Sequence, residues 1–173
     1  MSFSVRRLGA ADAAIYRDIR LEALHGEPTA FSSDLSAESS LPLEDWSARL
    51  GRSYTFGAFD GDGLNGIATY IPKVGAKVAH RGNVVGVYVR PPARGRGAAR
   101  ALLAALIGDA RGRVRQLHLS VTAGNEAAIQ LYAQFGFQTY GTEPRALYVD
   151  GRYYDEHLMV LRLDEGGKKV TEQ

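Results

Sequence analysis

Apolar and polar positions along the chain change their period several times, and each change marks the boundary of an expected element. Short apolar or alternating runs predict strands at 3–8, 54–59, 64–71, 83–89, 117–121, 137–142, 146–149 and 153–163. Apolar residues three or four apart predict helices at 11–24, 42–50, 98–110 and 127–135. Residues 26–41 are rich in serine and proline and predict a loop.

The order of these elements predicts the fold class. Helices and strands alternate in the middle of the chain, and strands joined by tight turns, such as the one at Asp150 and Gly151, lie toward both ends. We therefore expect an α/β protein, with one domain over 1–165 built on a mixed central sheet of about seven strands with helices on both faces. Residues 166–173 are polar and without pattern, which predicts a flexible tail.

Composition excludes several classes of protein. The chain has 173 residues, of which 45% are hydrophobic and 23% charged, and this balance is typical of a globular domain that buries its own core. It has no cysteine, which excludes disulfides and cysteine nucleophiles. No run approaches the ~18 apolar residues of a membrane span. The N-terminal segment lacks the apolar core of a signal peptide, so we expect a cytoplasmic protein with no membrane partner.

The segment that joins the strand 83–89 to the helix 98–110 is the most informative one. It reads R-G-R-G-A-A from Arg94 to Ala99 and runs directly into the helix. Because glycine lacks a Cβ atom and the first turn of a helix leaves amide N–H groups unpaired, a phosphate could approach the main chain closely here. The segment fits neither a P-loop nor a dinucleotide fingerprint. The alternative is a glycine-rich start of a helix with solvated arginines.

This segment resembles the R/Q-x-x-G-x-G/A signature of the GNAT (GCN5-related) N-acetyltransferases. The resemblance implies that the loop amides bind the pyrophosphate of acetyl-CoA, that the preceding strand binds the pantetheine arm, and that a backbone N–H near Val89 stabilises the oxyanion. Together with one residue of the segment described next, the implied CoA-binding residues are Val87, Val89, Arg94, Gly95, Arg96, Gly97, Ala98, Ala99 and Asn125.

A second segment, 121–137, resembles the family's strand–helix pattern N-x-x-A-x-x-L-Y-x-x-x-G-F. Asn125 is a natural N-cap for the helix, and the resemblance adds a contact with the CoA arm. Tyr132 lies on the apolar stripe of the helix. It is either a core aromatic or, as the resemblance implies, the acid that protonates the departing CoA thiolate. With a similar C-terminal hairpin, the resemblance covers 3–163.

Transfer to an amine also requires a proton acceptor, because a free alkylamine has a pKa of about 10.4. The strand N-V-V-G-V-Y-V has no acid, whereas several members of the family carry a glutamate there. Glu22 is the suggested substitute, because helical spacing places it in line with Ile15 and Ile19. The alternative is an ion pair of Glu22 with Arg20 or Arg49.

The sequence thus predicts an N-acetyltransferase that moves the acetyl group of acetyl-CoA, its cosubstrate, directly to a primary amine in a ternary complex, without a metal. The acceptor, a small molecule or a peptide, stays open. The loop 26–41 is expected to cover its site, and the acids Glu27, Asp34 and Glu38 favour a cationic acceptor.

The same residues are also compatible with other functions and partners. The alternative function is a non-catalytic CoA-binding sensor or interaction module on the same fold. Arginines gather between Arg90 and Arg115, but the net charge of +2 argues against a nucleic-acid partner. The terminal hairpin leaves a homodimer open.

Overall fold

The computed structural model describes residues 3–61 and 63–164, and within them seven strands form one sheet in the order β1-β2-β3-β4-β5-β7-β6. The strands are β1 (Ser4–Arg7), β2 (Tyr54–Asp60), β3 (Gly63–Pro72), β4 (Arg81–Val89), β5 (Gln116–Thr122), β6 (Gln138–Val149) and β7 (Arg152–Arg162). The helices are α1 (Ala13–Gly26), α2 (Leu35–Ser39), α3 (Leu43–Arg52), α4 (Ala98–Ala110) and α5 (Glu126–Gln134), with 3-10 turns η1 (Ala10–Asp12), η2 (Pro28–Ala30) and η3 (Pro91–Ala93). The tail expected at 166–173 lies outside the described residues.

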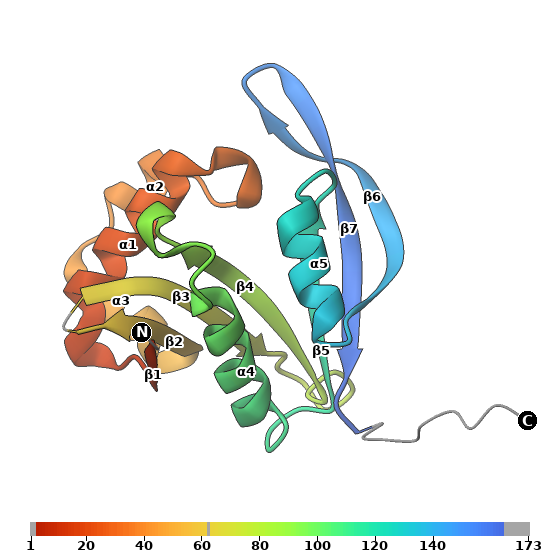
Figure 1. Cartoon of the computed structure of the whole chain (residues 1–173), viewed down its shortest axis with the longest axis horizontal. Helices are drawn as coiled ribbons and strands as arrows, with labels where there is room; N and C mark the ends of the chain where they lie inside the picture. The colour runs from red at the N-terminus through yellow and green to blue at the C-terminus, as the bar shows by residue number, and fades with distance from the viewer. Residues whose placement is uncertain (1–2, 62, 165–173) are drawn as a thin grey trace, which may run out of the picture.

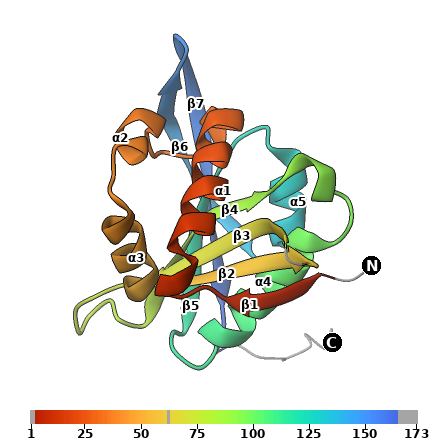
Figure 2. The same ribbon diagram turned by 90° about the vertical axis from the view of Figure 1, so that its left-hand side faces the viewer.

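The sheet is mixed and covered on both faces, as the sequence predicts. β4 and β5 are parallel, and the other neighbouring strands are antiparallel. Helices α1 and α3 lie on one face, where Ile19 and Trp46 belong to one buried cluster (Figure 2). Helices α4 and α5 lie on the other, where Leu102 and Leu106 belong to a second cluster with α5 and the strands (Figure 1). No helix in the described ranges is long and apolar enough to cross a membrane.

The buried face of α1 differs from the predicted stripe that includes both Ile15 and Ile19. Ile15 is 40% exposed, whereas Ile19 is fully buried. The side chains that α1 buries are Ala13, Tyr16, Ile19, Arg20, Ala23 and Leu24. The prediction missed this face because it counted aliphatic residues alone, while a tyrosine and an arginine contribute to the core through their rings and stems.

Two segments are more regular than the sequence predicts. The expected loop 26–41 contains η2 and α2, and Asp34 caps α2 by accepting a hydrogen bond from the amide of Ala37 at 2.9 Å. The strands predicted at 137–142 and 146–149 form a single strand, β6, whose register against β7 shifts next to Arg145, a residue with φ of 52°. A bent strand of this kind reads as two short ones in the apolar pattern.

The divergence of β4 from β5 positions the site. Their parallel register covers only 81–83 of β4 with 116–118 of β5, after which the two strands separate (Figure 1). β4 is also irregular on its other side, because its residues 86 and 87 both lie opposite Ala68 of β3. Gly86 adopts a φ of 62°, which favours glycine and allows this bulge. The result is a sheet opened like a V, with an unpaired edge of β4 along one wall.

Candidate active site

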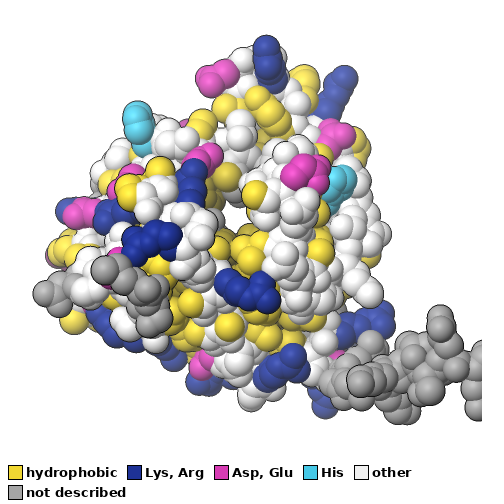
Figure 3. All heavy atoms as spheres, in the orientation of Figure 1, with side chains coloured by type: hydrophobic (Ala, Val, Ile, Leu, Met, Phe, Trp, Pro, Cys, Tyr) yellow, Lys and Arg dark blue, Asp and Glu magenta, His cyan; other side chains and the backbone are white. Residues whose placement is uncertain are grey.

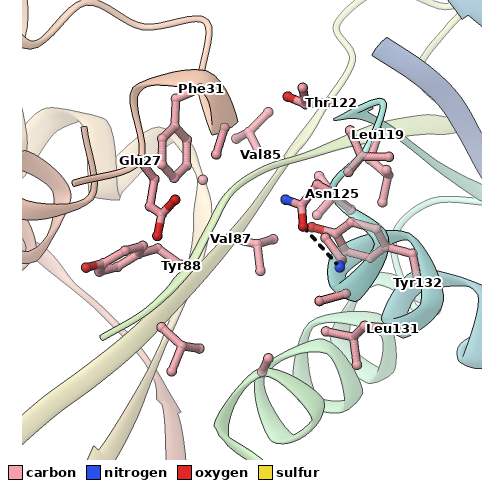
Figure 4. A pocket seen from close by; sticks show the side chains of 18 of the residues that line it. Glu27, Phe31, Val85, Val87, Tyr88, Leu119, Thr122, Asn125, Leu131 and Tyr132 are labelled. Atoms are coloured by element: carbon pink, nitrogen blue, oxygen red, sulfur yellow. Dashed lines mark hydrogen bonds between the residues drawn. The ribbon is translucent and has the colours of Figure 1, made fainter. Parts of the chain in front are cut away.

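A first cavity of about 390 Å³ lies between the diverging strands β4 and β5 and helix α5. Asn125, which caps α5, and Tyr132 of α5 face Val87 of β4 across it, whereas the Tyr88 side chain points away from them (Figure 4). Of the CoA-contacting and catalytic residues expected from the sequence, those that line it are Val87, Val89, Arg94, Ala99, Asn125 and Tyr132. Two stretches far apart in sequence, 87–99 and 125–132, thus meet at one cavity, as the resemblance implies.

The glycine loop at the start of α4 forms an open cradle at the end of this cavity. Gly95 and Gly97 have φ values of 71° and 91°, where residues with a Cβ are strained. A Cβ built on either glycine would meet no protein atom within 4 Å, so the space in front of the loop is open. The first helical backbone bond runs from Ala101 N to Gly97 O at 3.0 Å. The amides of 98–100 therefore have no intrahelical acceptor and can face an anion.

The three arginines of this loop make different contacts. Arg94 and Arg96 form ion pairs with Glu27 at 2.9 Å and Asp60 at 2.7 Å, respectively. Arg100 donates to the neutral amide of Gln134 at 2.7 Å. Its positive charge is therefore not offset by the group that it binds. Lys and Arg side chains lie to the left of and below the central hollow of this face, Asp and Glu side chains lie on its upper rim, and apolar side chains lie inside it (Figure 3).

Asn125 and Tyr132 occupy the α5 side of the cavity. Asn125 caps the helix, because its Oδ1 accepts a hydrogen bond from the amide of Ala128 at 3.3 Å, and its amide nitrogen points toward β4 (Figure 4). The Tyr132 side chain is 8% exposed and lies edge-on to Phe137. Burial raises the pKa of Tyr132 to about 12, so the hydroxyl keeps its proton throughout the neutral range. It can donate a hydrogen bond or a proton to a group in the cavity.

Glu22, the base suggested by the sequence, lies outside the residues that line this cavity. Its side chain is exposed, because it lies off the buried face of α1. Its carboxylate pairs with Arg90 at 2.9 Å and accepts a hydrogen bond from the Tyr88 hydroxyl at 3.1 Å. The alternative partners expected from the sequence, Arg20 and Arg49, are wrong, because both bind Glu38 instead.

We expect Glu22→Gln to leave kcat/KM within about twofold and to lower the melting temperature slightly. The half-exposed ion pair with Arg90 contributes at most about 1 kcal/mol, and solvent screens it. Steady-state rates and melting curves of the two proteins measure both effects. A fall in kcat of about a hundredfold, with the melting temperature unchanged, would instead show that Glu22 acts as the base, as the sequence suggests.

A second cavity of about 370 Å³ adjoins the first at the bulge of β4. Its walls come from α1, the segment 30–38, α3 and the sheet. The two cavities share Ala30, Phe31, Val84, Val85, Gly86 and Ser120. The second cavity also contains charged residues that the sequence did not single out for a site, namely Arg20, Arg49 and Glu156. Only the charge of Arg20 within a helical run of apolar residues could have indicated the buried cation.

The acids of 26–41 do not give this region the free negative charge that the sequence suggested. Glu27 is paired with Arg94. Asp34 accepts hydrogen bonds from within its own turn. Glu38 is buried between two arginines, and this segment does line the second cavity. The expectation of a cationic acceptor therefore loses its basis in these three side chains, because each already has a positive or hydrogen-bonding partner.

Comparison with known proteins decides the family. The family model described as the acetyltransferase (GNAT) family matches residues 16–137. The chain is 35% identical over 177 residues to an L-methionine sulfoximine/L-methionine sulfone acetyltransferase of Pseudomonas paraeruginosa, covering 95% of this chain and 96% of that protein. This chain belongs to the acetyltransferase (GNAT) family. It is an acyltransferase, and enzymes of this family take their acetyl group from acetyl-CoA.

Solved structures agree with this assignment at the level of the fold. A GNAT acetyltransferase from Streptococcus pneumoniae superposes with a TM-score of 0.83 and 24% identity. The match covers 92% of the present chain and 98% of the Streptococcus pneumoniae chain. The yncA protein of Salmonella typhimurium, solved with its cofactor acetyl-CoA, superposes with a TM-score of 0.78 and 24% identity. That match covers 99% of this chain and 100% of the other.

Proposed function

We propose that this GNAT enzyme transfers the acetyl group of acetyl-CoA directly to the primary amine of a small molecule, with both substrates bound at once. The observation that carries the proposal is the pair of cavities that adjoin at the bulge of β4. One cavity suits an extended thioester, and the other suits an acceptor that approaches its acetyl end. A direct transfer needs both sites to be open to each other, and it needs no covalent intermediate on the protein.

The first cavity suits CoA on three counts. The open cradle at Gly95 and Gly97 admits a pyrophosphate to the amides at the start of α4. The edge of β4 that faces away from β3 has no partner strand beyond residue 83 within 3–61 and 63–164, so its main-chain groups can bind an extended arm. The aliphatic and alanine side chains that line the middle of the cavity suit the apolar parts of that arm.

The protein's own groups supply the chemistry that the transfer requires. When the amine attacks the acetyl carbonyl carbon, a C–N bond forms and negative charge develops on the carbonyl oxygen. A backbone N–H of β4 near Val89 would stabilise that charge. As the C–S bond then breaks, the Tyr132 hydroxyl would donate its hydrogen bond or proton to the sulfur. The proton that the amine loses passes to solvent water that enters the second cavity, which adjoins the CoA site.

The size of the second cavity and the identity of the relative both favour a small-molecule acceptor. The relative from Pseudomonas paraeruginosa is named for L-methionine sulfoximine and L-methionine sulfone, and it matches over nearly its whole length. A cavity of about 370 Å³ is of the size that encloses a small ligand. An acceptor of the amino-acid size would fit it.

Acetyl-CoA should raise the melting temperature of the protein. At a concentration 100 times its dissociation constant, a ligand that binds only the folded state adds about 2.7 kcal/mol, or roughly 5–10 °C for a domain of this size. Differential scanning fluorimetry measures the shift, and desulfo-CoA should produce nearly the same one because few expected contacts involve the sulfur. Thiol release across a panel of amines then tests turnover. No shift at millimolar acetyl-CoA would contradict the proposed function.

A further inference from the structure

Arg20 of α1 is a buried cation, and one of its guanidinium nitrogens is without a hydrogen-bond acceptor in the described part of the chain. Its side chain lies in the second cavity and the residue is 8% exposed. Nε and Nη2 bind the Glu38 carboxylate at 3.2 and 3.3 Å, and Nη2 also donates to the Ser33 hydroxyl at 2.9 Å. Nη1 makes no hydrogen bond with any residue in 3–61 or 63–164. A Cβ built on Gly86 would lie 3.4 Å from Nη1, so this nitrogen points at the bulge where the two cavities meet.

The charges around Arg20 leave an excess of positive charge beside that bulge. Glu38 binds Arg20 and also Arg49, at 3.1 Å, so two guanidinium groups share one carboxylate. Burial opposes the ionisation of Glu38, but the hydrogen bonds and charges of the two arginines outweigh it and hold its pKa below the usual range. The cluster therefore carries one net positive charge, and a buried cation is stabilised by an anion that it can hydrogen-bond.

The opposite wall of the second cavity carries a carboxylate. Glu156 lies on β7, is half-buried and lines the cavity together with Ser120 of β5. Its side chain makes no hydrogen bond or ion pair with the described part of the chain. It is the one carboxylate lining this cavity, among the described residues, whose charge no arginine offsets. A protonated amine entering the cavity would therefore be attracted to this wall.

We propose that the second cavity binds an α-amino acid, with its carboxylate on Nη1 of Arg20 and its amine on the side of Glu156. The inference rests on the proposed function, because acetyl transfer must occur where the two cavities meet. The amine has to reach that shared wall, and Nη1 of Arg20 points at the same wall beside Gly86. A carboxylate bound there must lie close to the reacting amine, which is the arrangement of an α-amino acid.

In this arrangement Arg20 and Glu156 select the acceptor and hold it for attack. The Arg20 guanidinium has little freedom, because it is fixed by Glu38 and lies over the Phe31 ring with 5.1 Å between Cζ and the ring centroid. A fixed donor can bind a carboxylate without first being ordered. Before attack, the amine gives up its proton, and Glu156 lies on the side from which a carboxylate or a water bound to it can accept that proton.

The test compares acceptors that differ by one carboxylate. L-methionine sulfone and 3-(methylsulfonyl)propylamine form one pair, and L-phenylalanine and phenethylamine form another. We expect kcat/KM of the wild-type enzyme to be at least tenfold higher for an amino acid than for its amine in the pair that it accepts. Arg20→Met should reduce this ratio by about 10- to 100-fold, the size of effect typical of a hydrogen bond to a charged group. Release of CoA thiol measures all the rates.

Two further variants separate the roles. Glu156→Gln should lower kcat/KM by at least about tenfold for both members of a pair, through a higher KM and a lower kcat, because both carry the amine that Glu156 attracts and deprotonates. Glu143→Gln is the matched control, because Glu143 lies opposite Glu156 in the β6–β7 register, is exposed and lines neither cavity, so it should change nothing.

Arg20→Met should fold, because Arg49 still pairs with Glu38. If it does not, Arg20→Lys should show the same loss of preference, because a single ammonium cannot serve both Glu38 and the substrate.

Three results would overturn the inference. The first is a wild-type enzyme that prefers the amine or turns over neither member of any pair. The second is an Arg20→Met enzyme that loses the same factor for amino acid and amine, since Arg20 would then stabilise the acetyl oxyanion. The third is an equal effect of Glu143→Gln and Glu156→Gln. Binding of acetyl-CoA and turnover of some other amine would leave the proposed acetyl transfer standing in each case.

Discussion

Replacing Gly97 with valine should abolish the binding of CoA while the protein stays folded. Gly97 has a φ of 91°, and a Cβ built on it would meet no atom of the described chain within 4 Å, its two chain neighbours aside. A branched side chain would fill that space and push the backbone away from the conformation that exposes the amides. We expect the dissociation constant for CoA, measured by isothermal titration calorimetry, to rise by more than about a hundredfold, since several charge-assisted hydrogen bonds are lost together.

Gly151→Val provides a matched control for this substitution. Gly151 also has a positive φ, 77°, and open space around its Cβ position, but it lies at the turn between β6 and β7. Both variants should therefore lose a similar 1–2 kcal/mol, roughly, from backbone strain. Only Gly97→Val should lose the ability to bind CoA. If the two variants bind CoA equally well, or if Gly97→Val binds as tightly as the wild type, the loop at the start of α4 is not the phosphate site.

The fold and several residues that line the first cavity could be predicted because their signals are local in sequence. The spacing of apolar residues along the chain predicts the strands and helices, and the order of these elements then favours a mixed sheet. The glycine loop and the segment from Asn125 to Tyr132 each carry their chemistry within a few residues. The structure brings both to the first cavity, next to Val87. A resemblance based on two short segments was therefore enough to indicate residues that the structure brings to one cavity.

The charged lining of the second cavity could not be predicted, because it is assembled from distant elements by packing. Arg20, Glu38 and Arg49 come from three helices, and Glu156 comes from the strand β7 near the end of the described chain. Nothing in the local pattern says that these charges face one cavity. Glu22 shows the same limit, because a rotation of α1 by less than one turn decides whether its carboxylate faces a core, a cavity or the solvent.

Tyr132→Phe should lower kcat by about a hundredfold and leave the dissociation constant of CoA within about threefold. The hydroxyl is the only group removed, and the ring would still pack against Phe137. General acid catalysis contributes about 10²–10⁴-fold to the rate, and the difference between the pKa values of the two groups favours the low end. The pKa of Tyr132 is raised to about 12, well above the value of about 8.5 for an ordinary thiol. Complete transfer to a free thiolate is therefore uphill, and the hydroxyl acts mainly as the sulfur gains charge.

Tyr70→Phe gives the opposite pattern and serves as the control. Tyr70 is fully buried, lines neither cavity and donates a hydrogen bond to Asp109 at 2.5 Å, so losing its hydroxyl should lower the melting temperature and leave kcat unchanged. Tyr132→Phe should do the reverse, because the Tyr132 hydroxyl faces the cavity rather than a partner in the core. Melting curves, calorimetry with CoA and steady-state kinetics on the two variants separate the roles. A Tyr132→Phe enzyme with unchanged kcat and a lowered melting temperature would make Tyr132 a core residue, and the departing thiolate would then leave without an acid from α5.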